Sequence, residues 1–149
     1  MAVDLSQFPE IKNFSSVIRF SLYLEEASVD FYEKAAELKP DAAELFQSLA
    51  DAHKKRISLL EDTRQEKLNE MILEPITGVE REAYLPDVEL NDQSEVMNKS
   101  IALEENAQKF YTDLMEAAKE LSREASKVYK QMAKENSKML KKLWRIVIS

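Results

Sequence analysis

One motif occurs twice in this chain and constrains its fold more than any other feature. Leu24-Glu25-Glu26 is followed by Phe31-Tyr32, and Leu103-Glu104-Glu105 is followed at the same spacing by Phe110-Tyr111. The second copy begins about half a chain length after the first. This repeat indicates an internal duplication of helical hairpins, and two such hairpins packed together form a four-helix bundle.

The composition favours a single all-α domain over residues 1–149 and excludes several kinds of site. One Gly and four Pro in 149 residues is a low share for a loop-rich fold. The absence of Cys excludes disulfides and thiolate metal sites, and a single His excludes His-rich metal sites. A net charge of −7 argues against nucleic acid as a partner.

The same sequence gives expectations for the cellular compartment. No apolar run approaches the roughly 18 residues that a membrane-spanning helix needs. The beginning, Met-Ala-Val-Asp, does not resemble a signal peptide. We therefore expect a soluble cytoplasmic protein with no membrane partner.

Apolar residues recur at helical spacing between the four prolines, and this periodicity predicts four helices. The first begins near Asn13 to Ser16 and runs to about Leu38, and Ser122 caps the last, which runs close to the C-terminus. Between them the sequence predicts a helix over 41–73, a long crossover connection over 75–91 and a third helix over 92–118. The expected architecture is an up-down bundle of two antiparallel hairpins joined by the crossover.

Each predicted helix has an apolar stripe that should face the core. The stripes are Ile18, Leu22, Glu25, Val29, Tyr32 and Ala36; Phe46, Leu49, His53, Arg56 and Leu60; Met97, Ile101, Glu104, Tyr111 and Met115; and Val128, Met132, Asn136, Met139, Leu143 and Val147. Trp144 is expected in the core or at a subunit contact.

Glu25 and Glu104 lie on these stripes, whereas Glu26 and Glu105 are rotated by about 100° toward solvent. A buried carboxylate costs several kcal/mol unless a cation or hydrogen bonds compensate it. Two carboxylates at matched depth therefore need a shared positive partner, and a pair of metal ions is one such partner.

At these residues the chain resembles the rubrerythrin-like branch of the ferritin-like superfamily over essentially its whole length. In that family, two helices each supply a Glu about seven residues before a Tyr, which Glu25 with Tyr32 and Glu104 with Tyr111 match. The resemblance implies a ferritin-like bundle and, in the family, a di-iron site that carries oxidoreductase chemistry.

The family's other two helices each supply Glu-x-x-His, and this chain lacks both motifs. Leu49-Ala50 leads to His53 and Arg56, and Met132-Ala133 leads to Asn136 and Met139. Two other registers are open: one places His53 at the position of the family His with Ala50 at the Glu position, and Glu135-x-x-Lys138 is the alternative on the last helix. Every register leaves the oxygen-rich ligand set of iron or manganese incomplete.

A polar cluster without metal is the physical alternative. Arg56 carries a permanent charge that can pair with Glu25, Glu104 or both, and His53 and Asn136 can add hydrogen bonds. Met139 would be an apolar filler, while Tyr32 and Tyr111 would be neighbouring core aromatics. We therefore predict no cofactor and a degenerate di-iron site whose cluster is centred on Arg56; a site retaining iron or another divalent metal on Glu25, Glu104 and His53 is the alternative.

These residues predict a rubrerythrin-related protein that has lost di-iron redox activity and serves as a non-catalytic binding or scaffold bundle. The alternative is an oxidoreductase or iron-handling protein with a divergent metal site. The protein or small-molecule partner is unknown from sequence. A homodimer is expected through apolar residues of the helix-end overhang and crossover: Leu68, Met71, Ile72, Ile76, Val79, Tyr84 and Leu85. Alternatively, the crossover covers the overhang within one monomer.

Overall fold

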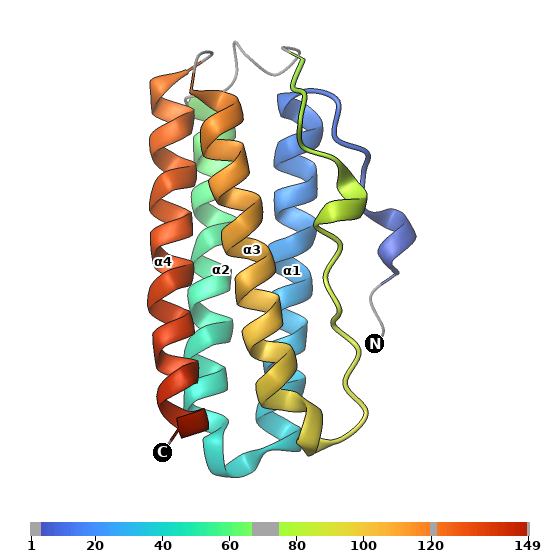
Figure 1. Ribbon diagram of the computed structural model, residues 1–149, viewed down its shortest axis with the longest axis vertical. Helices are drawn as coiled ribbons and strands as arrows, with labels where there is room; N and C mark the ends of the chain where they lie inside the picture. The colour runs from blue at the N-terminus through green and yellow to red at the C-terminus, as the bar shows by residue number, and fades with distance from the viewer. Residues whose placement is uncertain (1–3, 67–74, 120–121, 149) are drawn as a thin grey trace.

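Four long helices form the protein in the computed structural model, which describes residues 4–66, 75–119 and 122–148. They are α1 (Phe14–Leu38), α2 (Ala43–Glu66), α3 (Val96–Ala118) and α4 (Arg123–Ile148). Helix α1 packs mainly against α2, and α3 mainly against α4, as two antiparallel pairs (Figure 1). The described residues contain no β-strand. The predicted all-α bundle of two hairpins is confirmed, and its ferritin-like assignment stays a prediction.

Capping residues begin α1 and α4 where the sequence predicted. The Asn13 side chain accepts a hydrogen bond from the Ser16 amide at 3.0 Å, and the Ser16 hydroxyl accepts one from the Asn13 amide at 3.0 Å. This reciprocal pair satisfies two amide groups that the first helical turn leaves free. At α4 the Ser122 hydroxyl accepts from the Ala125 amide at 3.2 Å.

The two other helices begin a few residues later than predicted, because a short 3-10 turn precedes each. The turn Pro40–Ala42 comes before α2, and the turn Gln93–Glu95 comes before α3. The second turn is capped by Asp92, whose carboxylate accepts from the Ser94 amide at 2.8 Å. The predicted end of the second helix at Leu73 lies outside the described residues.

The described part of the crossover runs along the side of the bundle away from α4 (Figure 1). The Tyr84 hydroxyl donates to the Asp113 carboxylate at 2.6 Å, and the Asn106 side chain donates to the Tyr84 carbonyl at 2.8 Å. Ile76, Val79 and Tyr84 are buried in the core of the same chain. Three of the four crossover residues expected at a dimer interface are therefore covered within the chain, and the fourth, Leu85, is partly buried against the same core. Leu68, Met71 and Ile72 lie outside the described residues.

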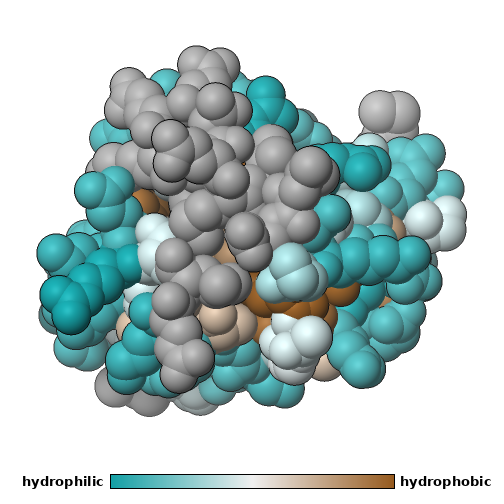
Figure 2. All heavy atoms as spheres, turned by 90° about the horizontal axis from the view of Figure 1, so that it is seen from above, coloured by the Kyte–Doolittle hydropathy of each residue, from teal (hydrophilic) through white to brown (hydrophobic). Residues whose placement is uncertain are grey.

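Most of the predicted core stripe is buried. Leu22, Met97, Met115 and Val128 are only partly buried, and Val147, which is 42% exposed, corrects the prediction. Trp144 is 46% exposed and so is not in the core, while the subunit contact that was its alternative place stays a prediction. Both residues lie in the last turns of α4 at the end of the bundle (Figure 1). Viewed from above, the described surface is mainly hydrophilic with a smaller hydrophobic area (Figure 2). No helix in the described ranges is long and apolar enough to span a membrane.

The core consists of two apolar clusters that follow each other along the bundle. One contains Phe20, Leu24, Phe110 and Tyr111, and the other contains Phe31, Phe46, Leu103 and Met139. Glu25, His53 and Glu104 lie on α1, α2 and α3 at the level where one cluster gives way to the other. The fold thus places charged groups in the middle of an otherwise apolar core.

Candidate functional site

All four helices contribute to a buried charged cluster. Glu25 comes from α1, His53 and Arg56 from α2, Glu104 from α3 and Asn136 from α4. Arg56 is 3% exposed and the other four are fully buried. Glu26 and Glu105 are exposed, as their rotation around the helix predicted. In each Glu pair, the buried member is therefore the one that helical spacing placed on the inward face.

His53 lies at the centre of this cluster and bridges the two glutamates. Its Nδ1 is 2.5 Å from Glu25 Oε1, and its Nε2 is 2.7 Å from Glu104 Oε2. An ionised carboxylate accepts hydrogen bonds but donates none, so both ring nitrogens must carry protons to make both contacts. Burial opposes a charge on His53, but Glu104 and Glu25 outweigh it and raise its pKa to about 9. His53 is therefore an imidazolium at neutral pH.

The two tyrosines cross between the helix pairs. The Tyr32 hydroxyl on α1 donates to Glu104 Oε2 on α3 at 2.5 Å, and the Tyr111 hydroxyl on α3 donates to Glu25 Oε2 on α1 at 2.6 Å. Burial and the neighbouring carboxylate raise the pKa of each tyrosine well above its usual value. Both tyrosines therefore remain protonated donors, and each connects its own helix pair to the glutamate of the other.

The glutamates stay ionised despite their burial. Burial alone would raise the pKa of Glu25, but His53 and Arg56 lower it more, and the net shift is downward. The pKa of Glu104 is lowered in the same way, mainly by the charge and hydrogen bond of His53. The cluster thus contains two carboxylates and two protein cations.

Arg56 lies beside the cluster and not at its centre, which corrects the sequence prediction. Its Nη2 donates to the Met132 carbonyl on α4 at 2.6 Å, while its Nη1 is 3.6 Å from Glu25 Oε2. Among the described residues Nη1 has no hydrogen-bond partner. Arg56 follows His53 by almost one helical turn, so the side chain reaches across to α4. Helical spacing places both residues on the inward face but does not reveal which one touches both glutamates.

Asn136 and Met139 take different places on α4. The Asn136 Nδ2 donates to Glu104 Oε1 at 2.6 Å, whereas its Oδ1 has no hydrogen-bond partner within the described part of the chain. Met139 is buried in the second apolar cluster, in the filler role that was predicted. The alternative register would place Glu135 and Lys138 inward, but the Glu135 side chain is 41% exposed and Lys138 is exposed. Asn136 is therefore the inward residue of α4 at this level.

Two further residues lie beside the cluster: Glu135, which the sequence offered only through the alternative register of the last helix, and Tyr129, to which the sequence assigned no role. Glu135 Oε1 is 3.8 Å from Arg56 Nε, and the Tyr129 ring stacks on Tyr111 with centroids 6.2 Å apart. The Tyr129 hydroxyl is buried, with no hydrogen-bond partner in the described ranges. Its helical spacing with Met132 and Asn136 is a signal that could have identified Tyr129.

The residues that could hold a metal are Glu25, Glu104 and His53, and their arrangement does not fit one. A histidine binds a metal through a free lone pair on one ring nitrogen. Both nitrogens of His53 face carboxylates instead. A divalent ion would also be added beside Arg56 in a cluster whose charges are already matched. No group of three or more His, Cys, Asp or Glu among the described residues has the geometry to hold a metal ion.

Comparisons of the chain with protein-family models, with curated proteins and with solved structures found no match.

Proposed function

We propose that the chain is a rubrerythrin-related, ferritin-like four-helix protein in which protein cations replace a metal pair. It acts as a non-catalytic bundle that binds a ligand or serves as a scaffold. The observation that carries this proposal is the position of His53 between the two glutamates, at 2.5 and 2.7 Å. An imidazolium there supplies the positive charge that the resemblance assigns to metal ions.

The charge and donor set of the cluster support a structural role. Oxidative chemistry at a metal pair needs two ions with open coordination positions. Here His53 occupies one oxygen of each glutamate, and Tyr32, Tyr111 and Asn136 donate to the cluster as well. Each of the four carboxylate oxygens accepts at least one hydrogen bond from a protein donor, so the site favours holding helices together over binding a reactant.

An oxidoreductase or iron-handling role remains the second candidate. It has one specific observation in its favour, because each buried glutamate has a tyrosine hydroxyl within 2.6 Å. Tyrosines next to a metal site can carry an electron or a proton. This candidate requires His53 to lose a proton and turn one nitrogen toward the metal.

Metal analysis of protein purified without a His-tag, after growth with iron, separates the two candidates. We expect far less than one iron, manganese or zinc per chain and no detectable reduction of hydrogen peroxide with an electron donor. His53→Glu/Arg56→His restores Glu-x-x-His on α2 and is the matched control for metal binding. Stoichiometric metal in the unaltered protein, with peroxide reduction abolished by Glu104→Ala, would overturn the proposal.

The homodimer stays a prediction. Light scattering at micromolar protein checks it: a dimer gives about twice the chain mass of 17.2 kDa. A mass equal to one chain at all concentrations would contradict it.

A further inference from the structure

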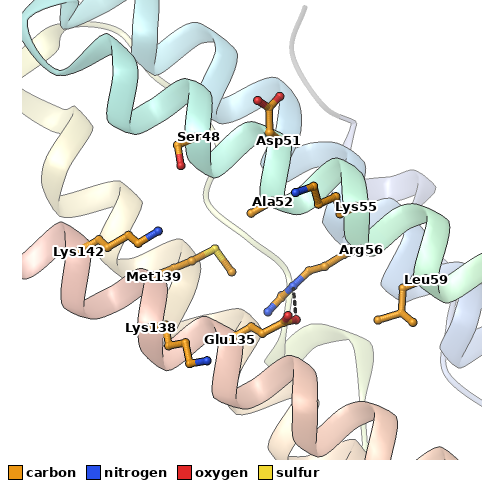
Figure 3. A pocket seen from close by; sticks show the side chains of 10 residues that line it. All are labelled: Ser48, Asp51, Ala52, Lys55, Arg56, Leu59, Glu135, Lys138, Met139 and Lys142. Carbon is orange, nitrogen blue, oxygen red and sulfur yellow. Dashed lines mark ion pairs between the residues drawn. The ribbon is translucent and has the colours of Figure 1, made fainter.

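A groove opens between α2 and α4 on the outer side of the charged cluster (Figure 3). Its volume is about 560 Å³, within the range of pockets that hold small organic ligands. Helix α2 contributes Lys55 and Arg56, and helix α4 contributes Lys138 and Lys142. The groove is therefore separate from the glutamates but shares Arg56 with their cluster.

The groove is cationic in a protein that is acidic as a whole. Four of its lining residues are basic, whereas Asp51 and Glu135 are the two acidic ones. Lys55, Lys138 and Lys142 form no ion pair within 4.0 Å in the described part of the chain. Helix α4 carries eight Lys or Arg and two Glu, while the whole chain has a charge of −7. Such local positive charge attracts anions.

Three of the lining side chains are apolar, and the Arg56–Glu135 ion pair lies between two of them, Met139 and Leu59 (Figure 3). Ala52 and Leu59 line it from α2 and Met139 lines it from α4, and Leu59 is 38% exposed. Figure 3 shows Met139 and Arg56 between the helices, with Lys142 and Lys138 on the α4 side. Arg56 donates to the Met132 carbonyl, which holds its guanidinium group close to α4. A ligand that fits has an anionic head and an apolar body.

We propose that this groove binds an amphiphilic carboxylate, an aliphatic chain ending in one carboxylate group. The head contacts Lys138 and Lys142, and the chain runs along Met139 and Ala52 and past the Arg56–Glu135 pair to Leu59. The inference rests on the proposed non-catalytic function and names the class of ligand that such a bundle would bind. Inorganic anions match the lysines but not the apolar walls, so they should bind more weakly.

Calorimetric titration with decanoate below its micelle concentration tests this proposal. We expect saturable binding of one decanoate per chain, with acetate and inorganic phosphate binding at least tenfold more weakly. Lys138→Gln/Lys142→Gln should weaken decanoate binding about tenfold, because it removes the two α4 cations of the groove. Leu59→Ser should weaken decanoate without affecting acetate.

Lys130→Gln/Lys134→Gln is the matched control, since it removes two exposed α4 lysines that do not line the groove. It should leave decanoate binding within twofold of the unaltered protein. The inference is overturned if decanoate does not bind, if both double variants bind equally, or if phosphate binds as tightly as decanoate. Metal analysis is independent of these outcomes. If decanoate does not bind and the protein also contains no metal, the groove proposal is refuted and the proposed non-catalytic function is not.

Discussion

The two helix pairs contribute equal negative charge to the core and unequal positive charge. Helices α1 and α3 match at the cluster, since Glu25 and Glu104 are both buried and each accepts from the tyrosine of the other pair. Helices α2 and α4 do not match: α2 brings His53 and Arg56, while α4 brings the neutral Asn136. One helix pair therefore neutralises the carboxylates of both pairs.

This difference shows that each helix pair need not supply a positive partner for its own glutamate. Each glutamate needs a positive partner. One cationic side chain that contacts both glutamates serves as the partner of both. His53 does so from α2, which leaves the corresponding level of α4 with only a neutral donor. We infer that stability depends much more on the polar residues of α2 than on those of α4.

Removing His53 should have the largest effect on stability. In His53→Ala, both glutamates lose their shared partner, and breaking a buried ion pair from one side costs roughly 3–5 kcal/mol. We expect the free energy of unfolding to fall by about 4 kcal/mol, measured by urea denaturation followed by circular dichroism. The variant should also take up protons at the glutamates as it folds.

A fall below about 1 kcal/mol would contradict the central place of His53. Thr63→Ala is a suitable control on the same helix, because the Thr63 hydroxyl donates to the Leu59 carbonyl and lies outside the cluster. We expect that control to change stability by about 1 kcal/mol or less.

The pH dependence of stability should also separate the two helix pairs. The pKa of His53 is raised from 6.5 to about 9, so its contribution is complete below pH 6.5 and is lost as pH rises toward 9. This shift corresponds to about 3 kcal/mol. The pKa values of Glu25 and Glu104 are lowered, so their contribution is present above pH 4.5 and is lost as pH falls further.

The acid loss therefore comes from both pairs, whereas the alkaline loss comes from α2 alone. Urea midpoints measured from pH 5 to pH 9.5 should show the decline above pH 6.5 in the unaltered protein. The decline should be absent in His53→Gln, which cannot titrate. A similar decline in that variant would assign the alkaline loss to other groups.

Residue periodicity predicted the helices and the inward glutamates well, because a 3.6-residue repeat determines which side chains face the core. The depth of Glu25 and Glu104 and the caps at Asn13 and Ser122 follow from local sequence alone. The starts of α2 and α3 were placed early, because a 3-10 turn and an α-helix have similar local sequence signals.

The centre of the cluster could not be predicted in this way. His53 and Arg56 share one face of α2, and the choice between them depends on side-chain length and on the distance across the bundle. Arg56 is long enough to reach the Met132 carbonyl of α4, whereas the shorter His53 fits between the carboxylates. The exposure of Val147 likewise depends on where the neighbouring helices end.

Asn136 should show the smallest effect of the polar residues in the cluster. In Asn136→Ala, Glu104 loses the hydrogen bond from Nδ2 but keeps those from His53 and Tyr32. The Asn136 Oδ1 has no hydrogen-bond partner among the described residues, so its removal relieves a buried unpaired group. A hydrogen bond to a charged group contributes about 1.5–3 kcal/mol, and the relieved oxygen offsets part of it, so we expect a loss of about 1 kcal/mol.

Urea denaturation measures this loss, with Gln131→Ala as the control. Gln131 is exposed on α4, and that variant should stay within about 0.5 kcal/mol of the unaltered protein. A loss as large as that of His53→Ala would show that α4 supports the carboxylates as strongly as α2 does, and the asymmetry between the two helix pairs would then be wrong.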